Sequence, residues 1–260
     1  MKIRVLVENT TKMDCPVEHG LSLYIETGAH HILFDTGQTE LFAENAERFG
    51  VDLKKVDLCF LSHGHYDHGG GLKRFTEINQ TARVYMSRHA FEPHYRGEDR
   101  YIGLNPAWLQ DEDLQNRIIY TESMVEIAPD LTICGPGKDK LIDMGCDGQL
   151  LRENGVFKPE DFRHEHYLMV REAGRRILIS GCSHQGIINI VDWFKPDVLI
   201  GGFHFMRMSL DEQMAGFGRR LAAYDTEYYT CHCTGTDQYE FLKSYIQKLH
   251  YISEGMEILI

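Results

Sequence analysis

The stretch that decides the fold reads His63-Gly64-His65-Tyr66-Asp67-His68-Gly69-Gly70-Gly71. It follows the apolar run 56–62, which predicts a buried strand. Residues i and i+2 of extended backbone project to the same side, so His63 and His65 can face one cation. Asp67 and His68 lie past that point, where glycines let the chain turn, and can face a second cation. Imidazole and carboxylate are the usual ligands of zinc, iron and manganese, so the stretch predicts a metal site.

Four later histidines stand beside predicted strands and are candidates to complete this site. His184 and His232 each follow a buried strand that passes into a glycine-containing turn. His204 follows another strand, and His164 precedes one. Histidines at the same end of successive strands are what a shared metal site requires, although any one of them alone also fits a hydrogen-bonded structural role. Other histidines lack this setting and are expected to be ordinary: His30, His31, His89, His94 and His250.

The rest of the chain alternates strands and helices in two stretches. Apolar periodicity predicts strands at 2–8, 20–26, 31–34, 56–62, 82–86, 167–170, 176–180, 197–201, 227–230 and 256–260, and helices at 39–49, 72–78, 186–194, 210–223 and 237–249. This rhythm suits two sheets packed face to face with helices outside. Between the stretches, an insertion at about 88–160 holds five of the seven prolines and predicts short strands at 117–120, 124–127 and 131–134 within long loops. Such loops form either a functional lid or a variable decoration.

Composition limits the classes of protein to consider. The chain has 260 residues, 43% hydrophobic and 25% charged, which fits a single α/β domain over 1–260. Its 27 basic and 39 acidic residues give a net charge of −12, so nucleic acid and anionic membrane are not expected as partners. The N-terminus is typical of a strand and not of a signal peptide, and we expect a cytoplasmic protein. Seven scattered cysteines without a Cys-x-x-Cys pair indicate reduced thiols.

The histidine stretch, with the upstream Phe34-Asp35-Thr36-Gly37, resembles the metallo-β-lactamase superfamily. A subgroup is still more similar, namely the metal-dependent hydrolases often labelled 7,8-dihydropterin-6-yl-methyl-4-(β-D-ribofuranosyl)aminobenzene-5′-phosphate synthase. The matching segments span about residues 5–236 and include Leu6-Val7-Glu8-Asn9-Thr10, Glu18-His19-Gly20-Leu21-Ser22, Gly181-Cys182-Ser183-His184, Gly201-Gly202-Phe203-His204 and His232-Cys233-Thr234-Gly235.

The resemblance implies a four-layer αββα sandwich with two divalent metal ions at one edge. Zinc is the expected metal, with manganese or iron as alternatives. It implies His63 and His65 on the first metal, Asp67 and His68 on the second, and His232 as the last histidine of the superfamily pattern. Asp35 would hold a histidine ligand by accepting its other ring N–H.

The middle ligand positions stay open. Many superfamily members carry Gly-Asp after the strand at 176–180, whereas this chain has Gly181-Cys182. Either Cys182 supplies a thiolate or His184 supplies an imidazole, and we favour His184 because imidazole reaches farther from a turn. Spacing also keeps His164 in consideration. His19 and His204 are candidates to protonate a leaving group or to hold substrate oxygens, or else they are core or outer histidines.

These features predict a binuclear metal-dependent hydrolase that uses a metal-bound hydroxide on a small phosphodiester or related phosphate-bearing molecule. One alternative is the phosphoribosyl-transferring synthase reaction of the methanopterin-type pathway that the subgroup label implies. A second alternative is a non-catalytic metal or redox sensor, with Cys231 and Cys233 as responsive thiols beside a cation. The partner in the first two cases is a small-molecule substrate, and no pattern indicates an oligomeric state.

Overall fold

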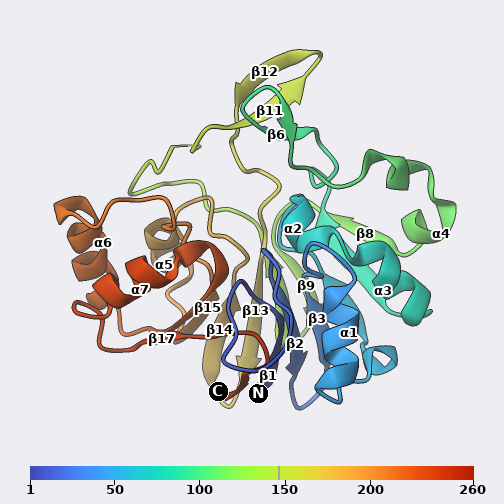
Figure 1. Ribbon diagram of the computed structural model, residues 1–260, viewed down its shortest axis with the longest axis horizontal. Helices are drawn as coiled ribbons and strands as arrows, with labels where there is room; N and C mark the ends of the chain where they lie inside the picture. Colours follow the sequence, from blue (N-terminus) through green and yellow to red (C-terminus); the bar gives the residue numbers. More distant parts are fainter. Residues whose placement is uncertain (146) are drawn as a thin grey trace. The chain divides into compact units, whose positions relative to one another are not determined.

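The computed structural model describes residues 1–145 and 147–260, which divide into two compact units (Figure 1). The first unit comprises Met1–Glu122, Cys146–His166 and Ser253–Ile260, and the second comprises Ser123–Gly145 and Tyr167–Ile252. Cys146 lies outside the described residues, so the expectation of a reduced thiol is not tested there. All six cysteines within the described ranges are free thiols.

The first unit is built on a seven-stranded sheet of order β18-β1-β2-β3-β4-β5-β8. Its strands are β1 (Lys2–Val7), β2 (Ser22–Glu26), β3 (His31–Phe34), β4 (Leu58–Phe60), β5 (Arg83–Ser87), β8 (Ile118–Thr121) and β18 (Glu257–Leu259). The run from β3 to β8 is parallel, whereas β18, β1, β2 and β3 are antiparallel neighbours. Because the carboxyl ends of β3 and β4 meet at one edge, the loops that begin at Asp35 and Leu61 start side by side.

Helices complete the core of this unit. They are α1 (Leu41–Arg48), α2 (Tyr66–Gly69), α3 (Leu72–Ile78) and α4 (Glu112–Gln115). Phe42 of α1 and Phe75 of α3 are fully buried in one apolar cluster with Leu33 and Cys59 of the sheet. The apolar residues whose spacing predicted helices at 39–49 and 72–78 therefore form the helix faces that pack on this sheet.

The second unit repeats this plan with a sheet of order β17-β16-β15-β14-β13-β10-β9. Its strands are β9 (Val125–Ala128), β10 (Leu131–Cys134), β13 (Tyr167–Glu172), β14 (Arg175–Ile179), β15 (Val198–Gly201), β16 (Glu227–Thr230) and β17 (Leu249–Tyr251). The four strands from β14 to β17 are parallel. The helices α5 (Ile187–Phe194), α6 (Glu212–Ala222) and α7 (Thr236–Leu242) bury Ile188, Phe217 and Leu242 in one cluster with Tyr228 of the sheet.

Two parts of the structure differ from the sequence expectation. The predicted helix 237–249 ends at Leu242, and β17 follows. Ile246 and Leu249 are buried although they lie outside a helix. Their apolar spacing matches that of a helix, which is why the sequence predicted a longer one. The region 88–160 contains the three expected strands, but it also forms a four-stranded sheet of order β12-β11-β6-β7, from β6 (His94–Arg96), β7 (Arg100–Tyr101), β11 (Gln149–Glu153) and β12 (Val156–Pro159).

A turn signal for part of this small sheet is present in the sequence. Asn154 and Gly155 link β11 to β12, and both have positive φ angles, of 50° and 82°. Asn-Gly in this conformation is the preferred two-residue hairpin turn. The remaining strands of the sheet, β6 and β7, have three and two residues and carry no comparable signal. Of the helices in the described ranges, none has the length and apolar character needed to cross a membrane.

The histidine-bearing loop after β4 packs tightly against the segment after β5, which predicts an effect of enlarging Gly64. A Cβ atom on Gly64 would lie 2.0 Å from the backbone oxygen of Ala90. We expect Gly64→Ala to lower the free energy of unfolding by roughly 1–3 kcal/mol, because backbone must move to make room. The matched control is Gly216→Ala in α6, where the nearest atom is 4.0 Å away and helix propensity favours alanine. Equal stabilities of the two variants in urea unfolding would contradict this packing.

Candidate metal centre

The side chains of the histidine-rich stretch gather in a buried loop of the first unit. The loop leaves β4 at Phe60 and enters α2 at Tyr66. His63, His65 and His68 are buried, and the ring of His63 lies 4.6 Å from that of His65 and 4.1 Å from that of His68, centroid to centroid. Three imidazoles so close together in a buried place would repel one another if all were protonated.

Asp35, at the end of β3, holds this loop in place. Its carboxylate is fully buried and accepts hydrogen bonds from the Ser62 N–H, the Ser62 hydroxyl and His68 Nδ1, each at 2.7 Å. Its backbone adopts a left-handed conformation with φ of 56°. Strained residues of this kind persist where the surroundings fix them, and they concentrate at functional sites.

The Asp35 contacts also set which ring nitrogen of two histidines carries the proton. His68 donates from Nδ1 to the carboxylate, so Nε2 is its unprotonated nitrogen in the neutral ring. The Ser62 hydroxyl gives its hydrogen to Asp35, so its oxygen accepts from His63 Nδ1 at 2.9 Å. His63 therefore also has its lone pair at Nε2. Metal-ligating histidines bind through one nitrogen while the other donates to such a partner, so this loop fits a divalent metal ion.

Asp67 and His19 extend the same loop. Asp67 Oδ2 lies 4.0 Å from His68 Nε2 and 3.3 Å from His19 Nε2. The His19 side chain is half exposed, with a relative accessible surface of 49%, whereas Asp67 is buried. His19 is therefore the member of this group that solvent and a substrate can reach.

His164 is drawn into the first unit's cluster, but in an orientation that does not suit a metal ligand. The Gly64 N–H donates to His164 Nδ1 at 2.9 Å, which uses that lone pair and leaves the proton on Nε2. Burial, followed by the neighbouring His94 and His65, holds the pKa of His164 well below its usual range, so the ring is neutral at pH 7. A neutral ring with Nε2–H is a hydrogen-bond donor.

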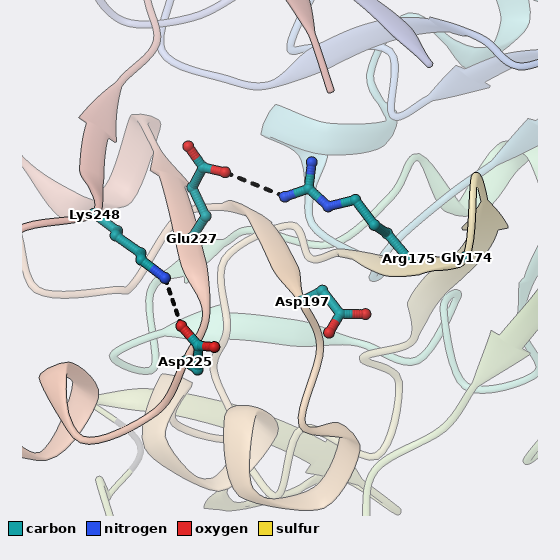
Figure 2. A pocket seen from close by; sticks show the side chains of 6 residues that line it. All are labelled: Gly174, Arg175, Asp197, Asp225, Glu227 and Lys248. Carbon is teal, nitrogen blue, oxygen red and sulfur yellow. Dashed lines mark hydrogen bonds and ion pairs between the residues drawn. The ribbon is translucent and has the colours of Figure 1, made fainter.

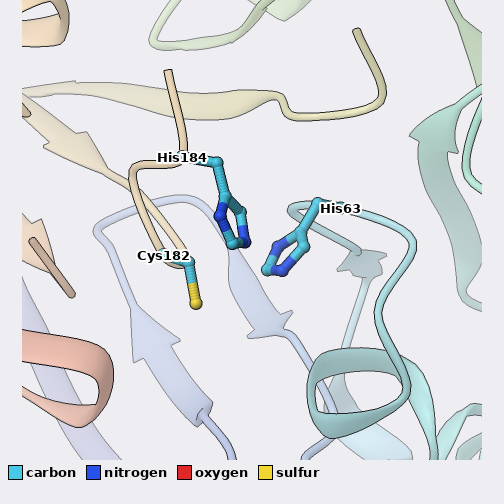
Figure 3. A group of neighbouring side chains, drawn as sticks. All are labelled: His63, Cys182 and His184. Atoms are coloured by element: carbon cyan, nitrogen blue, oxygen red, sulfur yellow. The ribbon is translucent and has the colours of Figure 1, made fainter. Parts of the chain in front are cut away.

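The second unit gathers its own candidates at the carboxyl ends of three adjacent parallel strands. Cys182 and His184 follow β14, His204 follows β15, and His232 follows β16. Figure 3 labels the side chains of Cys182 and His184, on the loop after β14, and that of His63, on the loop after β4. The rings of His184 and His204 lie 4.3 Å apart between centroids.

Backbone strain marks the same three loops. Ser183, His204 and His232 have positive φ angles of 59°, 58° and 49°, a conformation that residues with side chains seldom adopt. Each strand of the parallel run from β14 to β16 thus ends in a strained turn that carries a histidine. The sequence expectation that these histidines share one end of the sheet agrees with their positions, while their binding of metal stays a prediction.

Two thiols join the histidines of this unit. Cys182, His204 and Cys233 each offer one ligand atom within 4.8 Å of the others, and such a group can hold a metal ion. Burial alone raises the pKa of the Cys233 thiol, but hydrogen bonds with Cys182 and His204 and the nearby His232 together bring it well below its usual value. A thiol of this kind offers thiolate, the form that binds metal.

His94 is a member of the cluster that sequence reasoning missed. It begins β6 of the small sheet, is fully buried, and its ring stacks on His164 at 3.9 Å between centroids. Its Nδ1 donates to Glu160 Oε2 at 2.7 Å. No local pattern identifies His94, because its partners lie 66 and 70 positions later in the chain and the short strand has no hydrophobic alternation.

The structure also has a surface pocket in the second unit, shown in Figure 2. It is lined by charged side chains at the amino ends of β14 to β17, the opposite edge of this sheet from the histidines. Arg175 pairs with Glu227 at 3.2 Å and Lys248 with Asp225 at 2.5 Å. Its cations are thus already paired within the pocket, and ligands of open α/β sheets bind at the carboxyl ends of the strands, so this pocket is not our candidate site.

Comparison with known proteins gives related families and structures. The family model of the metallo-beta-lactamase superfamily matches residues 15–229. An uncharacterized protein of Methanocaldococcus jannaschii is 30% identical over 244 residues, 90% of this chain and 90% of the relative. A protein of the same organism named 7,8-dihydropterin-6-methyl-4-(beta-D-ribofuranosyl)-aminobenzene-5'-phosphate synthase is 27% identical over 258 residues, 90% of this chain and 88% of the relative.

A solved structure agrees with these matches. The crystal structure of Tm1679, described as a metal-dependent hydrolase of the beta-lactamase superfamily, aligns with a TM-score of 0.85 and 28% identity. The alignment covers 100% of this chain and 99% of that chain.

The role of Asp35 predicts a loss of zinc affinity when its charge is removed. Asn tolerates the left-handed backbone, so Asp35→Asn keeps the turn, but its NH2 group replaces one acceptor oxygen, and it cannot accept all three hydrogen bonds from Ser62 and His68. We expect zinc affinity, measured by competition with a chelator, to fall by about 10–100-fold. The matched control is Asp57→Asn, whose carboxylate accepts the His31 N–H at 2.7 Å away from the cluster. Unchanged zinc affinity in a folded Asp35→Asn protein would contradict the assignment.

Proposed function

Because this chain belongs to the metallo-beta-lactamase superfamily, we propose that it is a hydrolase that uses two bound divalent metal ions, zinc by preference, with manganese or iron as alternatives. Its substrate is a small phosphodiester or a related phosphate-bearing molecule. The 28% identical structure described as a metal-dependent hydrolase supports the reaction class, since the alignment spans the whole chain.

The observation that carries the proposal is the hydrogen-bond network of Asp35. It fixes Nδ1 as the protonated nitrogen of both His63 and His68 and so presents Nε2 as the ligand atom. A structural histidine needs no such control, because either nitrogen can satisfy a single hydrogen bond. A pair of buried rings with the same assigned tautomer is what metal binding requires.

The proposed ligand set follows the sequence assignment. His63 and His65 belong to the first metal, and Asp67 and His68 to the second. By the same sequence assignment, the remaining proposed ligands are His184 and His232. Cys182 is the alternative at the position of His184, and its sulfur lies within 4.8 Å of ligand atoms of His204 and Cys233. His164 is left out of the set, because its Nε2 carries a proton.

The chain's own residues are suited to hydrolysis of a charged ester. Divalent ions held here would lower the pKa of coordinated water to roughly 7 and neutralise charge that develops on a phosphoryl oxygen. His19, half exposed beside Asp67, is placed to give a proton to a leaving group, and His204 is a second candidate for this role. The net charge of −12 repels a phosphate-bearing molecule from the surface as a whole, which favours a small substrate that reaches the cations.

This function is tested with zinc-loaded protein and bis-p-nitrophenyl phosphate. We expect release of nitrophenol that stops when the metal is removed with a chelator and returns when zinc is added. His65→Ala and Asp67→Ala should each abolish turnover and lower the zinc content measured by elemental analysis, with near-native far-ultraviolet circular dichroism. His250→Ala, an exposed histidine paired with Glu227, is the control and should behave as wild type. Wild-type zinc content in both ligand variants would overturn the ligand assignment.

The synthase reaction is the second candidate, because a relative with that name is 27% identical over most of both chains. In that reaction an aminobenzoate-type substrate attacks a phosphoribosyl pyrophosphate donor, pyrophosphate and carbon dioxide leave, and the metal would hold the pyrophosphate. Offering this substrate pair to the same zinc-loaded protein separates the candidates. Condensation without hydrolysis of the diester would replace our first proposal, and hydrolysis without condensation would eliminate the synthase reaction. The sensor role of Cys231 and Cys233 stays a prediction.

A further inference from the structure

We propose that His94 and His164 form a binding site for one phosphoryl oxygen of the substrate, beside the motif residue His65. The site deepens the proposed function and rests on it for the identity of the substrate. All its residues belong to the first unit, and two of them, His94 and Glu160, come from the region 88–160.

His164 supplies a hydrogen-bond donor. Its Nδ1 accepts the Gly64 N–H at 2.9 Å, so the proton of the neutral ring is on Nε2. The side chain is fully buried, and no protein group within the described residues accepts a hydrogen bond from Nε2. A buried N–H without an acceptor is destabilising, so a bound group that accepts from His164 Nε2 would stabilise this arrangement.

His94 supplies the second nitrogen. Its Nδ1 donates to Glu160 Oε2 at 2.7 Å, and Glu160 Oε1 accepts the Phe162 N–H at 3.2 Å. The side chains of His94 and Glu160 are 1% and 0% exposed, and His94 Nε2 has no hydrogen-bond partner in the described part of the chain. The carboxylate therefore fixes the ring of His94 so that Nε2 is presented to a ligand.

The small sheet brings His94 and Glu160 together. β6 pairs with β11, with His94 opposite Leu151, and the Glu160 N–H after β12 donates to Gln149 at the start of β11. Thus the strand that carries His94 and the residue that orients it are tied to the same neighbour. Part of the region 88–160, whose role as a lid or a decoration stays a prediction, thus holds His94 in position.

The spacing of the cluster fits an oxygen atom. The rings of His94 and His164 are stacked at 3.9 Å with an angle of 18° between their planes, and one ring nitrogen each of His65, His94 and His164 lies within 4.8 Å of the others. Because 4.8 Å is the upper limit of these separations, an oxygen atom can lie within about 2.8 Å (4.8/√3) of the ring nitrogens of His94 and His164. That is within the reach of a hydrogen bond.

The tautomers favour an oxygen ligand over a third metal ion. A metal ion needs a lone pair from each histidine, and His164 offers N–H at Nε2. The oxygen of a P–OH group suits both nitrogens: it accepts from His164 Nε2–H and donates to the lone pair of His94 Nε2. The site would hold the substrate's phosphoryl group next to His65, a proposed ligand of the first metal.

Asparagine variants test this site without breaking the structural hydrogen bonds. The side-chain amide of His94→Asn can still donate to Glu160, and that of His164→Asn can still accept from Gly64, while each variant lacks Nε2. The control is His89→Asn, because His89 makes the same kind of bond, Nδ1 to Glu92 Oε1 at 2.8 Å, away from the cluster. The probe is inorganic phosphate, titrated into zinc-loaded protein by calorimetry, with nitrogen-15 spectra of the imidazoles recorded in parallel.

We expect each asparagine variant to weaken phosphate binding by about tenfold to a hundredfold, with zinc content and circular dichroism as in wild type, whereas His89→Asn has no effect. In the wild type, phosphate should shift the Nε2 resonances of His94 and His164. Unchanged phosphate affinity in both variants would overturn the proposal. Loss of zinc from either variant would also overturn it, because that residue would then belong to the metal ligands.

The outcome is independent of the hydrolysis assay. Wild-type protein that hydrolyses the diester, with variants that bind phosphate normally, would remove this site and leave the proposed function intact. Phosphate binding that depends on both histidines in a protein without hydrolytic activity would keep the site and remove the proposed function.

Discussion

The buried carboxylate of Asp35 is the interaction on which the candidate metal centre depends. One side chain accepts from the Ser62 backbone, the Ser62 hydroxyl and His68 and thereby orients two histidines of one loop. A buried charge is tolerated only where hydrogen bonds or cations compensate it. Three donors at 2.7 Å supply that compensation, and the two metal ions proposed at His63 and at His68 would add to it. The left-handed backbone at Asp35 is a further strain that this network must outweigh.

The same physical plan recurs in the two units. In each, parallel strands run through an apolar sheet covered by helices, and the polar side chains stand in the loops after their carboxyl ends. Asp35 and His63 follow β3 and β4, whereas His184, His204 and His232 follow β14, β15 and β16. The regular sheets supply rigidity and the strained turns aim the side chains. Strain of this kind persists only on a rigid frame, which is why the well-packed cores and the distorted loops occur together.

Much of this arrangement could be predicted from the sequence. The metallo-β-lactamase fold is confirmed by the family match and the full-length structural alignment. Local patterns placed most strands and helices, because burial of one face leaves a periodic trace. The histidine stretch by itself predicted the loop between β4 and α2 as a candidate metal site. The resemblance implied that Asp35 holds a histidine, but only the structure names His68 as that histidine.

What could not be predicted depends on contacts between distant residues. His94 meets Glu160 and His164 through strands of three to five residues whose pairing no periodicity records. The orientation of His164 likewise follows from one backbone N–H, that of Gly64, 100 positions earlier. A sequence pattern identifies a histidine but not which nitrogen is protonated, and that assignment here separates the proposed metal ligands from the proposed substrate contacts.

Anomalous diffraction at the zinc edge, on crystals of zinc-loaded protein, tests the central claim most directly. We predict one metal peak about 2.0–2.1 Å from His63 Nε2 and a second at that distance from His68 Nε2, with Asp35 still bonded to the His68 Nδ1–H. A metal bound through Nδ1 of either ring, or no ordered metal near these histidines, would contradict the account.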